Sequence, residues 1–224
     1  MSITENINRI KATLPATVKL VAVSKTKPNE LLIEAYSIRQ RAFGENKVQE
    51  LVSKYEALPK DIEWHFIGHL QTNKIKQIIS FVHLIHGLDS FKLLKAIDKE
   101  AKQANRIVHC LLQFHIAEEE TKFGLSMDEA IEMLNSSEFK SLNHVKISGV
   151  MGMATYTDDN NQIRNEFAYL KSIFDKLKTE YFQLEAEFRE ISMGMSDDYL
   201  IAVQEGSTMV RIGSLIFGER IYSI

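Results

Sequence analysis

The sequence predicts an α/β fold, a single (β/α)8 barrel of the TIM type with one extra N-terminal helix, in which residues 1–224 form one domain. Three observations predict this fold. Eight short apolar runs rich in β-branched residues recur, most of them are separated by segments with helical spacing, and 224 residues is a compact length for such a barrel. An open doubly wound sheet is the alternative, because it also alternates strands and helices.

The strands are predicted from the short apolar runs. In chain order they are Leu20–Lys25, Ala42–Asn46, Trp64–Gly68, Phe81–Gly87, Ile107–Ile116, Val145–Ala154, Glu190–Met195 and Met209–Phe217. Strands that alternate with helices pair in parallel through right-handed crossovers. Their carboxyl ends then meet at one edge of the barrel, where we expect the functional site.

The helices are predicted from capping signals and from apolar residues at spacings of three and four. Ser2 with Glu5 and Ser126 with Glu129 have the spacing of capping boxes, and another helix follows Ser90. The longest helix runs from about 161 to 182. Its apolar stripe comprises Ile163, Phe167, Leu170, Phe174, Leu177 and Tyr181.

The composition excludes several classes of protein. Lys+Arg 27 against Asp+Glu 30 gives a net charge of −3, so no basic field indicates binding to nucleic acid. No apolar run is long enough to span a membrane, and the N-terminus lacks the pattern of a signal peptide. The single cysteine, Cys110, lies in an apolar run and cannot form an internal disulfide. We therefore expect a cytoplasmic protein.

Lys25 is the first candidate for chemistry. Side chains alternate along a strand, so Val21, Val23 and Lys25 share one face of the first strand. If the valines fill the interior, Lys25 lies inside at the carboxyl end, where desolvation lowers the pKa of a lysine and favours attack on a carbonyl. A solvated lysine is the ordinary alternative, and Lys27 ranks second because Pro28 follows it.

The last two strands predict a phosphate site. In such barrels the loops after strands seven and eight often bind phosphate. Gly194 and Gly213 allow backbone N–H groups to approach phosphate oxygens, and Ser192 and Ser214 add hydroxyl donors.

Arg211 shares a face with Gly213 and so points into the barrel. A buried arginine needs an acceptor, because its charge is costly to desolvate. The acceptor is either a ring nitrogen of a bound heterocycle or an acid such as Glu45, and the residues alone leave both open.

Several motifs together resemble those of the pyridoxal phosphate homeostasis proteins, over about residues 18 to 220. They are Ala22–Pro28, Phe43–Asn46, Val48–Glu50, Trp64–Gln71, Asn73–Lys74, Lys122–Leu125, Gly149–Met151, Ser192–Asp197 and Arg211–Gly218. The resemblance implies a barrel like the N-terminal domain of alanine racemase, with pyridoxal 5′-phosphate as cofactor. By the same resemblance Lys25 binds the cofactor as a Schiff base. Asn46 then lies close to the ring, Arg211 faces the pyridine nitrogen, and the phosphate is bound by Ser192, Gly213 and Ser214.

Three functions are compatible with these residues. The first is a carrier that takes part in intracellular vitamin B6 homeostasis without turnover, with no catalytic residue. The second is an amino-acid racemase, which needs a base on each face of the substrate. The chain ends at Ile224, so we expect no second domain to supply the second base. The third is a phosphosugar enzyme, with Glu45 and Asp89 as its acid–base pair.

The remaining histidines do not predict a metal site. His65 with His69 and His83 with His86 have ligand spacings suited to a helix, but both pairs fall on predicted strands or strand ends. We expect a monomer without bound metal, and apoenzymes that use pyridoxal phosphate as candidate partners.

Overall fold

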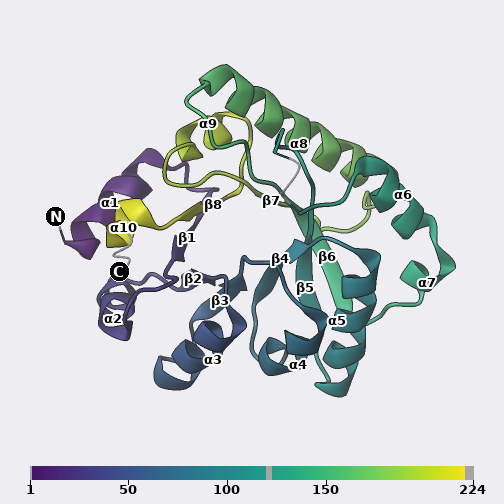
Figure 1. Cartoon of the computed structure of the whole chain (residues 1–224), viewed down its shortest axis with the longest axis horizontal. Coiled ribbons are helices and arrows are strands. Elements are labelled where there is room, and N and C mark those ends of the chain that lie inside the picture. The colour runs from purple at the N-terminus through teal and green to yellow at the C-terminus, as the bar shows by residue number, and fades with distance from the viewer. Residues whose placement is uncertain (1, 120–122, 220–224) are drawn as a thin grey trace.

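The computed structural model describes residues 2–119 and 123–219, so Lys122, the first residue of one family motif, lies outside the described part. The described residues form eight parallel strands that close into a barrel in chain order, as predicted (Figure 1). The strands are β1 Lys19–Val23, β2 Ala42–Glu45, β3 Glu63–Phe66, β4 Leu84–Leu88, β5 Val108–Gln113, β6 Val145–Met151, β7 Glu190–Ser192 and β8 Met209–Ile212. Closure through pairing of β1 with β8 excludes the open sheet.

Helices surround the strands, and the extra N-terminal helix is α1. The helices are α1 Ile3–Thr13, α2 Asn29–Ser37, α3 Val48–Ala57, α4 Ile75–Ile78 after a 3₁₀ turn at Thr72–Lys74, α5 Phe91–Gln103, α6 Met127–Asn135, α7 Ser137–Lys140, α8 Asn160–Glu180, α9 Tyr199–Gln204 and α10 Ser214–Phe217. Both predicted capping boxes are present, at Ser2 and Ser126. Asn6 on α1 donates to the carbonyl of Ile216 across 3.0 Å, which holds α1 beside α10 (Figure 1).

All eight strands are shorter than the sequence predicts, and two of these differences bear on the site. β8 ends at Ile212, because Gly213 turns the chain and begins α10. β1 ends at Val23, which places Lys25 in the turn after the strand rather than on its last residue. Both differences lengthen the loops at the carboxyl edge of the barrel.

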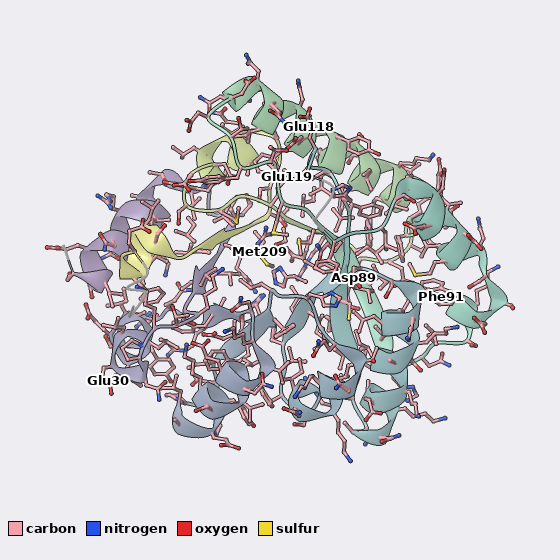
Figure 2. All side chains as sticks on the ribbon, viewed as in Figure 1. Glu30, Asp89, Phe91, Glu118, Glu119 and Met209 are labelled. Atoms are coloured by element: carbon pink, nitrogen blue, oxygen red, sulfur yellow. The ribbon has the colours of Figure 1, made fainter. Side chains whose placement is uncertain are left out.

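The strands bury both faces, in two separate clusters. The interior cluster comprises Val21, Ala42, Leu84, Leu111, Met151 and Met209. Figure 2 shows Met209 in the middle of the ring of strands and Glu30 outside it on α2. A larger cluster, including the fully buried Trp64 and Phe167, lies between the strands and the helices. Val21 in the interior confirms the predicted inward face of the first strand.

The structure bears on two sequence predictions, one about membrane-spanning helices and one about Cys110. Within residues 2–119 and 123–219, no helix has the length and apolar character needed to cross a bilayer. Cys110 is fully buried, and its burial raises the pKa of the thiol above the ordinary range.

Candidate functional site

A cavity of about 770 Å³ opens at the carboxyl ends of the strands. Its lining includes five of the six predicted site residues, namely Lys25, Asn46, Arg211, Gly213 and Ser214. They follow β1, β2 and β8 or lie on β8, so closure of the barrel brings them together. The edge on which they meet is the one that the sequence predicts.

Lys25 reaches the cavity from a tight turn after β1. The Ser24 N–H donates to the Gly44 carbonyl across 3.0 Å, and the Thr26 N–H donates to Glu50 Oε1 across 2.6 Å. Thr26 has φ +65°, a left-handed conformation that reverses the chain at once. Lys25 is half-buried at this turn, on the wall of the cavity.

Lys27 also lines the cavity, but its ammonium group has a structural role. Its Nζ donates to the carbonyls of Phe217 and Gly218 across 3.0 and 2.9 Å. These contacts tie Lys27 to the end of α10. Lys25 stays the first candidate for attack on a carbonyl.

The phosphate loops meet at Gly213. Its N–H donates to Ser196 Oγ across 3.4 Å, and it precedes α10, whose start has no side-chain cap. A Cβ at Gly213 would lie 3.2 Å from the Val23 carbonyl oxygen, so a side chain there would crowd β1. Ser196 lines the cavity and the sequence reasoning missed it. Its position in the loop beyond β7, rather than on the strand, is the signal that could have identified it.

Ser192, the sixth predicted residue, does not line the cavity. It is fully buried on β7, where its Oγ accepts a hydrogen bond from Arg211 Nη1 across 2.6 Å. The same Oγ lies 2.9 Å from His86 Nδ1. Direct contact of Ser192 with a phosphate stays a prediction.

Arg211 lies at the inner end of the cavity and is almost fully buried. Besides Ser192 it donates from Nη2 to the Gly152 carbonyl across 3.1 Å. Burial lowers the pKa of Arg211 to about 10, and the negative charge of Asp198 partly opposes this shift. The guanidinium is still protonated at neutral pH and can donate into the cavity.

The proposed ion pair of Arg211 with Glu45 is not what the structure contains. Glu45 accepts instead from Lys54 Nζ across 2.8 Å and from Ser24 Oγ across 2.6 Å. Burial raises the pKa of Glu45, while the charge of Lys54 opposes the rise.

Two histidines extend the polar network below Arg211. His86 Nε2 lies 2.9 Å from His65 Nδ1, and both rings are fully buried. Burial lowers the pKa of each well below its usual value, so both are neutral at neutral pH. A continuous chain of hydrogen bonds thus runs from His65 through His86 and Ser192 to Arg211.

The rim carries a histidine–carboxylate pair, of which the sequence analysis named Asp89 but not His69 as an acid–base candidate. His69 Nδ1 lies 2.7 Å from Asp89 Oδ2, and the His69 ring stacks on Phe123 at 4.3 Å. Asp89 is therefore paired with a histidine, and Glu45 is absent from the cavity lining. Neither member of the acid–base pair in the phosphosugar hypothesis is among the residues that line the cavity.

The donor set fits a particular kind of ligand. A lysine amine lies on the wall, serine hydroxyls and a glycine N–H converge near α10, and a buried arginine donates from the inner end. These groups suit a carbonyl compound that carries a phosphate and an acceptor nitrogen. The cavity volume falls in the range of small-molecule sites.

Comparisons with known proteins match almost the whole chain. A family model described as the N-terminal domain of alanine racemase matches residues 1–221. A pyridoxal phosphate homeostasis protein of Aquifex aeolicus is 41% identical over 205 residues, 91% of this chain and 88% of that protein. The protein of that name from Helicobacter pylori is 40% identical over 204 residues, 90% of this chain and 88% of that protein.

A solved structure is similar over almost the whole chain. PipY of Synechococcus elongatus, with PLP bound, has a TM-score of 0.87 and 32% identity, covering 97% of this chain and 100% of that one.

Proposed function

The chain belongs to the family of pyridoxal phosphate homeostasis proteins, and from this premise we propose that it binds pyridoxal 5′-phosphate and takes part in intracellular vitamin B6 homeostasis without turnover. The observation that carries the proposal is the meeting of Lys25, Asn46, Arg211 and the Gly213–Ser214 loop in one cavity. The chemistry supplied by the cofactor when bound is that of a reactive aldehyde on a pyridine ring.

Each site residue has a proposed role. Lys25 would hold the cofactor, its amine joined to the aldehyde carbon as a Schiff base with loss of one water. Asn46 lies beside the ring, and Arg211 donates to the pyridine nitrogen without giving up its proton.

The phosphate end is proposed to lie between the loops after β7 and β8. The Gly213 N–H and the Ser214 hydroxyl would donate to phosphate oxygens. Ser196 lines the same cavity, and its Oγ accepts from the Gly213 N–H across 3.4 Å. Ser192 stays a proposed phosphate ligand, and its hydroxyl also accepts a hydrogen bond from Arg211.

A carrier role would follow from reversible binding of the cofactor's aldehyde. An aldehyde bound as a Schiff base is kept from other amines, yet hydrolysis returns it. The similar proteins of Aquifex aeolicus and Helicobacter pylori are named for homeostasis rather than for a reaction, which supports a role without turnover. The second candidate is racemase-like turnover, which the His69–Asp89 pair at the rim would favour as an added acid–base group.

We further propose a cytoplasmic monomer, with residues 1–224 as one domain, that supplies the cofactor to apoenzymes. The buried thiol of Cys110 suits a reducing compartment. Sedimentation velocity of the full chain with and without cofactor should give one monomer mass, and a dimer would contradict the proposal.

An absorbance spectrum followed by borohydride reduction and peptide mapping tests the binding. The full chain mixed with pyridoxal phosphate should develop a Schiff-base band, and the reduced adduct should map to Lys25. Lys25→Ala should lose band and adduct, whereas Lys27→Ala should keep both. An adduct on Lys27, or none, would refute the role of Lys25.

A further inference from the structure

A second cluster of ligating side chains lies at the end of the barrel opposite the cavity. Glu63 is the first residue of β3, His65 is the third, and His83 directly precedes β4. The His83 N–H donates to the Trp64 carbonyl across 2.9 Å, which holds the start of β4 beside β3. One ligand atom from each of Glu63, His65 and His83 lies within 4.8 Å of the other two.

The buried member of this cluster has an unused nitrogen. His65 is fully buried and its Nδ1 is taken by His86 across 2.9 Å. Within the part of the chain that the structure describes, His65 Nε2 has no hydrogen-bond partner. A buried imidazole nitrogen without a partner is costly, because it loses its bond to water on folding.

We propose that Glu63, His65 and His83 form a binding site for a zinc ion at the amino-terminal end of the barrel. Two imidazole nitrogens and one carboxylate oxygen are a usual zinc set, with water at the fourth position. Calcium and magnesium would not be expected here, because both prefer sets made of oxygen.

The geometry requires only small movements. His83 Nε2 and Glu63 Oε2 are 4.0 Å apart, and the His65 and His83 ring centres are 5.3 Å apart. Zinc bonds of about 2.0–2.1 Å place ligands about 3.4 Å apart, so the two outer side chains must close by less than about 1.5 Å. The side chains of His83 and Glu63 are 47% and 37% exposed, which leaves room for that shift.

One cation competes for the same carboxylate. Lys19 Nζ lies 3.1 Å from Glu63 Oε2. The Lys19 side chain is 41% exposed, so it can turn into solvent when the ion binds. A divalent ion bonded to the carboxylate replaces this exposed pair, whose own contribution is small.

The other ring nitrogen of His65, Nδ1, already has a hydrogen-bond partner in His86, as is usual for a zinc ligand. Metal-bound histidines donate their other N–H to a fixed partner, which sets the tautomer and the ring orientation. Zinc on His65 Nε2 places the proton on Nδ1, which then donates to His86 Nε2. His86 Nδ1–H in turn donates to Ser192 Oγ, so the ion sets the direction of the chain that ends at Arg211.

Titration of the full chain with Zn²⁺ after chelator treatment tests the site. Wild type should bind one ion, and Co²⁺ in its place should give the absorption of a tetrahedral site with nitrogen ligands. Glu63→Gln and His83→Gln should each weaken binding by at least about tenfold, the loss caused by removing even an outer partner of a zinc ligand. His144→Gln is the matched control, because His144 lies 3.9 Å from one carboxylate, that of Asp98, outside the cluster.

Nitrogen-15 spectra of the histidine rings separate a three-ligand site from surface binding. On addition of Zn²⁺ the His65 Nε2 signal should move and His86 should become fixed as the Nδ1–H tautomer. Equal loss of binding in His144→Gln, no effect of either cluster variant, or an unchanged His65 signal would each overturn the proposal. None of these readouts depends on pyridoxal phosphate.

Discussion

Arg211 Nη1 lies 2.6 Å from Ser192 Oγ, and this bond joins β8 to β7 behind the candidate cofactor cavity. The hydroxyl also contacts His86, so its removal deprives two buried polar groups of a partner. Ser192→Ala should therefore lower the free energy of unfolding by about 1–3 kcal/mol. Urea denaturation measures the change, with Ser172→Ala on the exposed face of α8 as the neutral control. A loss no larger than in the control would contradict the importance of this bond.

Ser214→Ala tests the proposed phosphate end. Losing a hydrogen bond to a charged acceptor should weaken binding of pyridoxal phosphate by about 1.5–3 kcal/mol and leave pyridoxal binding unchanged. Ser192→Ala should lower the same preference, because Ser192 is the other serine predicted to contact the phosphate. Fluorescence titration with the two ligands measures both affinities. Wild-type preference for the phosphorylated ligand in Ser214→Ala would place the phosphate elsewhere.

Lys54→Met tests the buried ion pair behind the turn of Lys25. Lys54 and Glu45 are both buried, so the variant leaves a buried carboxylate without its counter-charge and should lose about 3–5 kcal/mol at neutral pH. Lys95→Met removes the exposed pair with Glu138 and should cost less than about 1 kcal/mol. Equal losses in the two variants would show that burial of the pair does not matter.

The same carboxyl predicts a pH dependence. Burial raises the folded-state pKa of Glu45 above its ordinary value of 4.5, so the folded state binds the proton more tightly than the unfolded state does. The resulting stabilisation is complete below the unfolded pKa and is lost as the pH rises through the folded one. The deficit of Lys54→Met should therefore shrink as the pH is lowered toward 4.5. Thermal denaturation across that range checks the trend, and a deficit independent of pH would contradict it.

Phe167→Ala tests the packing of α8 on the strands. Phe167 is fully buried, so the cavity left behind should cost about 3–5 kcal/mol of unfolding free energy. Tyr169, two residues along, is half exposed, and Tyr169→Ala should cost much less. Chemical denaturation of both variants measures the difference, and similar losses would mean that α8 is not anchored through Phe167.

A carrier should not catalyse exchange at amino acids. The loaded protein with L-alanine in deuterated water should give no α-proton exchange above that of free cofactor. A deletion strain should have altered vitamin B6 pools, restored by wild type and not by Lys25→Ala. Rapid exchange would favour racemase-like turnover, and unchanged pools would remove the homeostasis proposal.

The amino-acid sequence by itself determined the features that depend on neighbouring residues. The two-residue period of β1 put Val21 inside the barrel, and the spacing of Ser2 with Glu5 predicted the start of α1. Both follow from backbone geometry within a few residues. The alternation of strands and helices then predicted the barrel and the edge on which Lys25 and Ser214 meet.

Only the tertiary structure decided which polar side chains become partners. Ser192 has a hydroxyl group and lies in the motif that predicts a phosphate site. Closure of the barrel places it against Arg211 and His86, whereas Ser196 lines the cavity. The spacing of His65 and His69 does not predict a metal site, because a spacing within one segment suits ligands on a helix and these residues lie at a strand. His65 instead meets Glu63 on its own strand and His83 on the next. Pairing between strands depends on register and on the fit of the whole interior, and no local pattern encodes either.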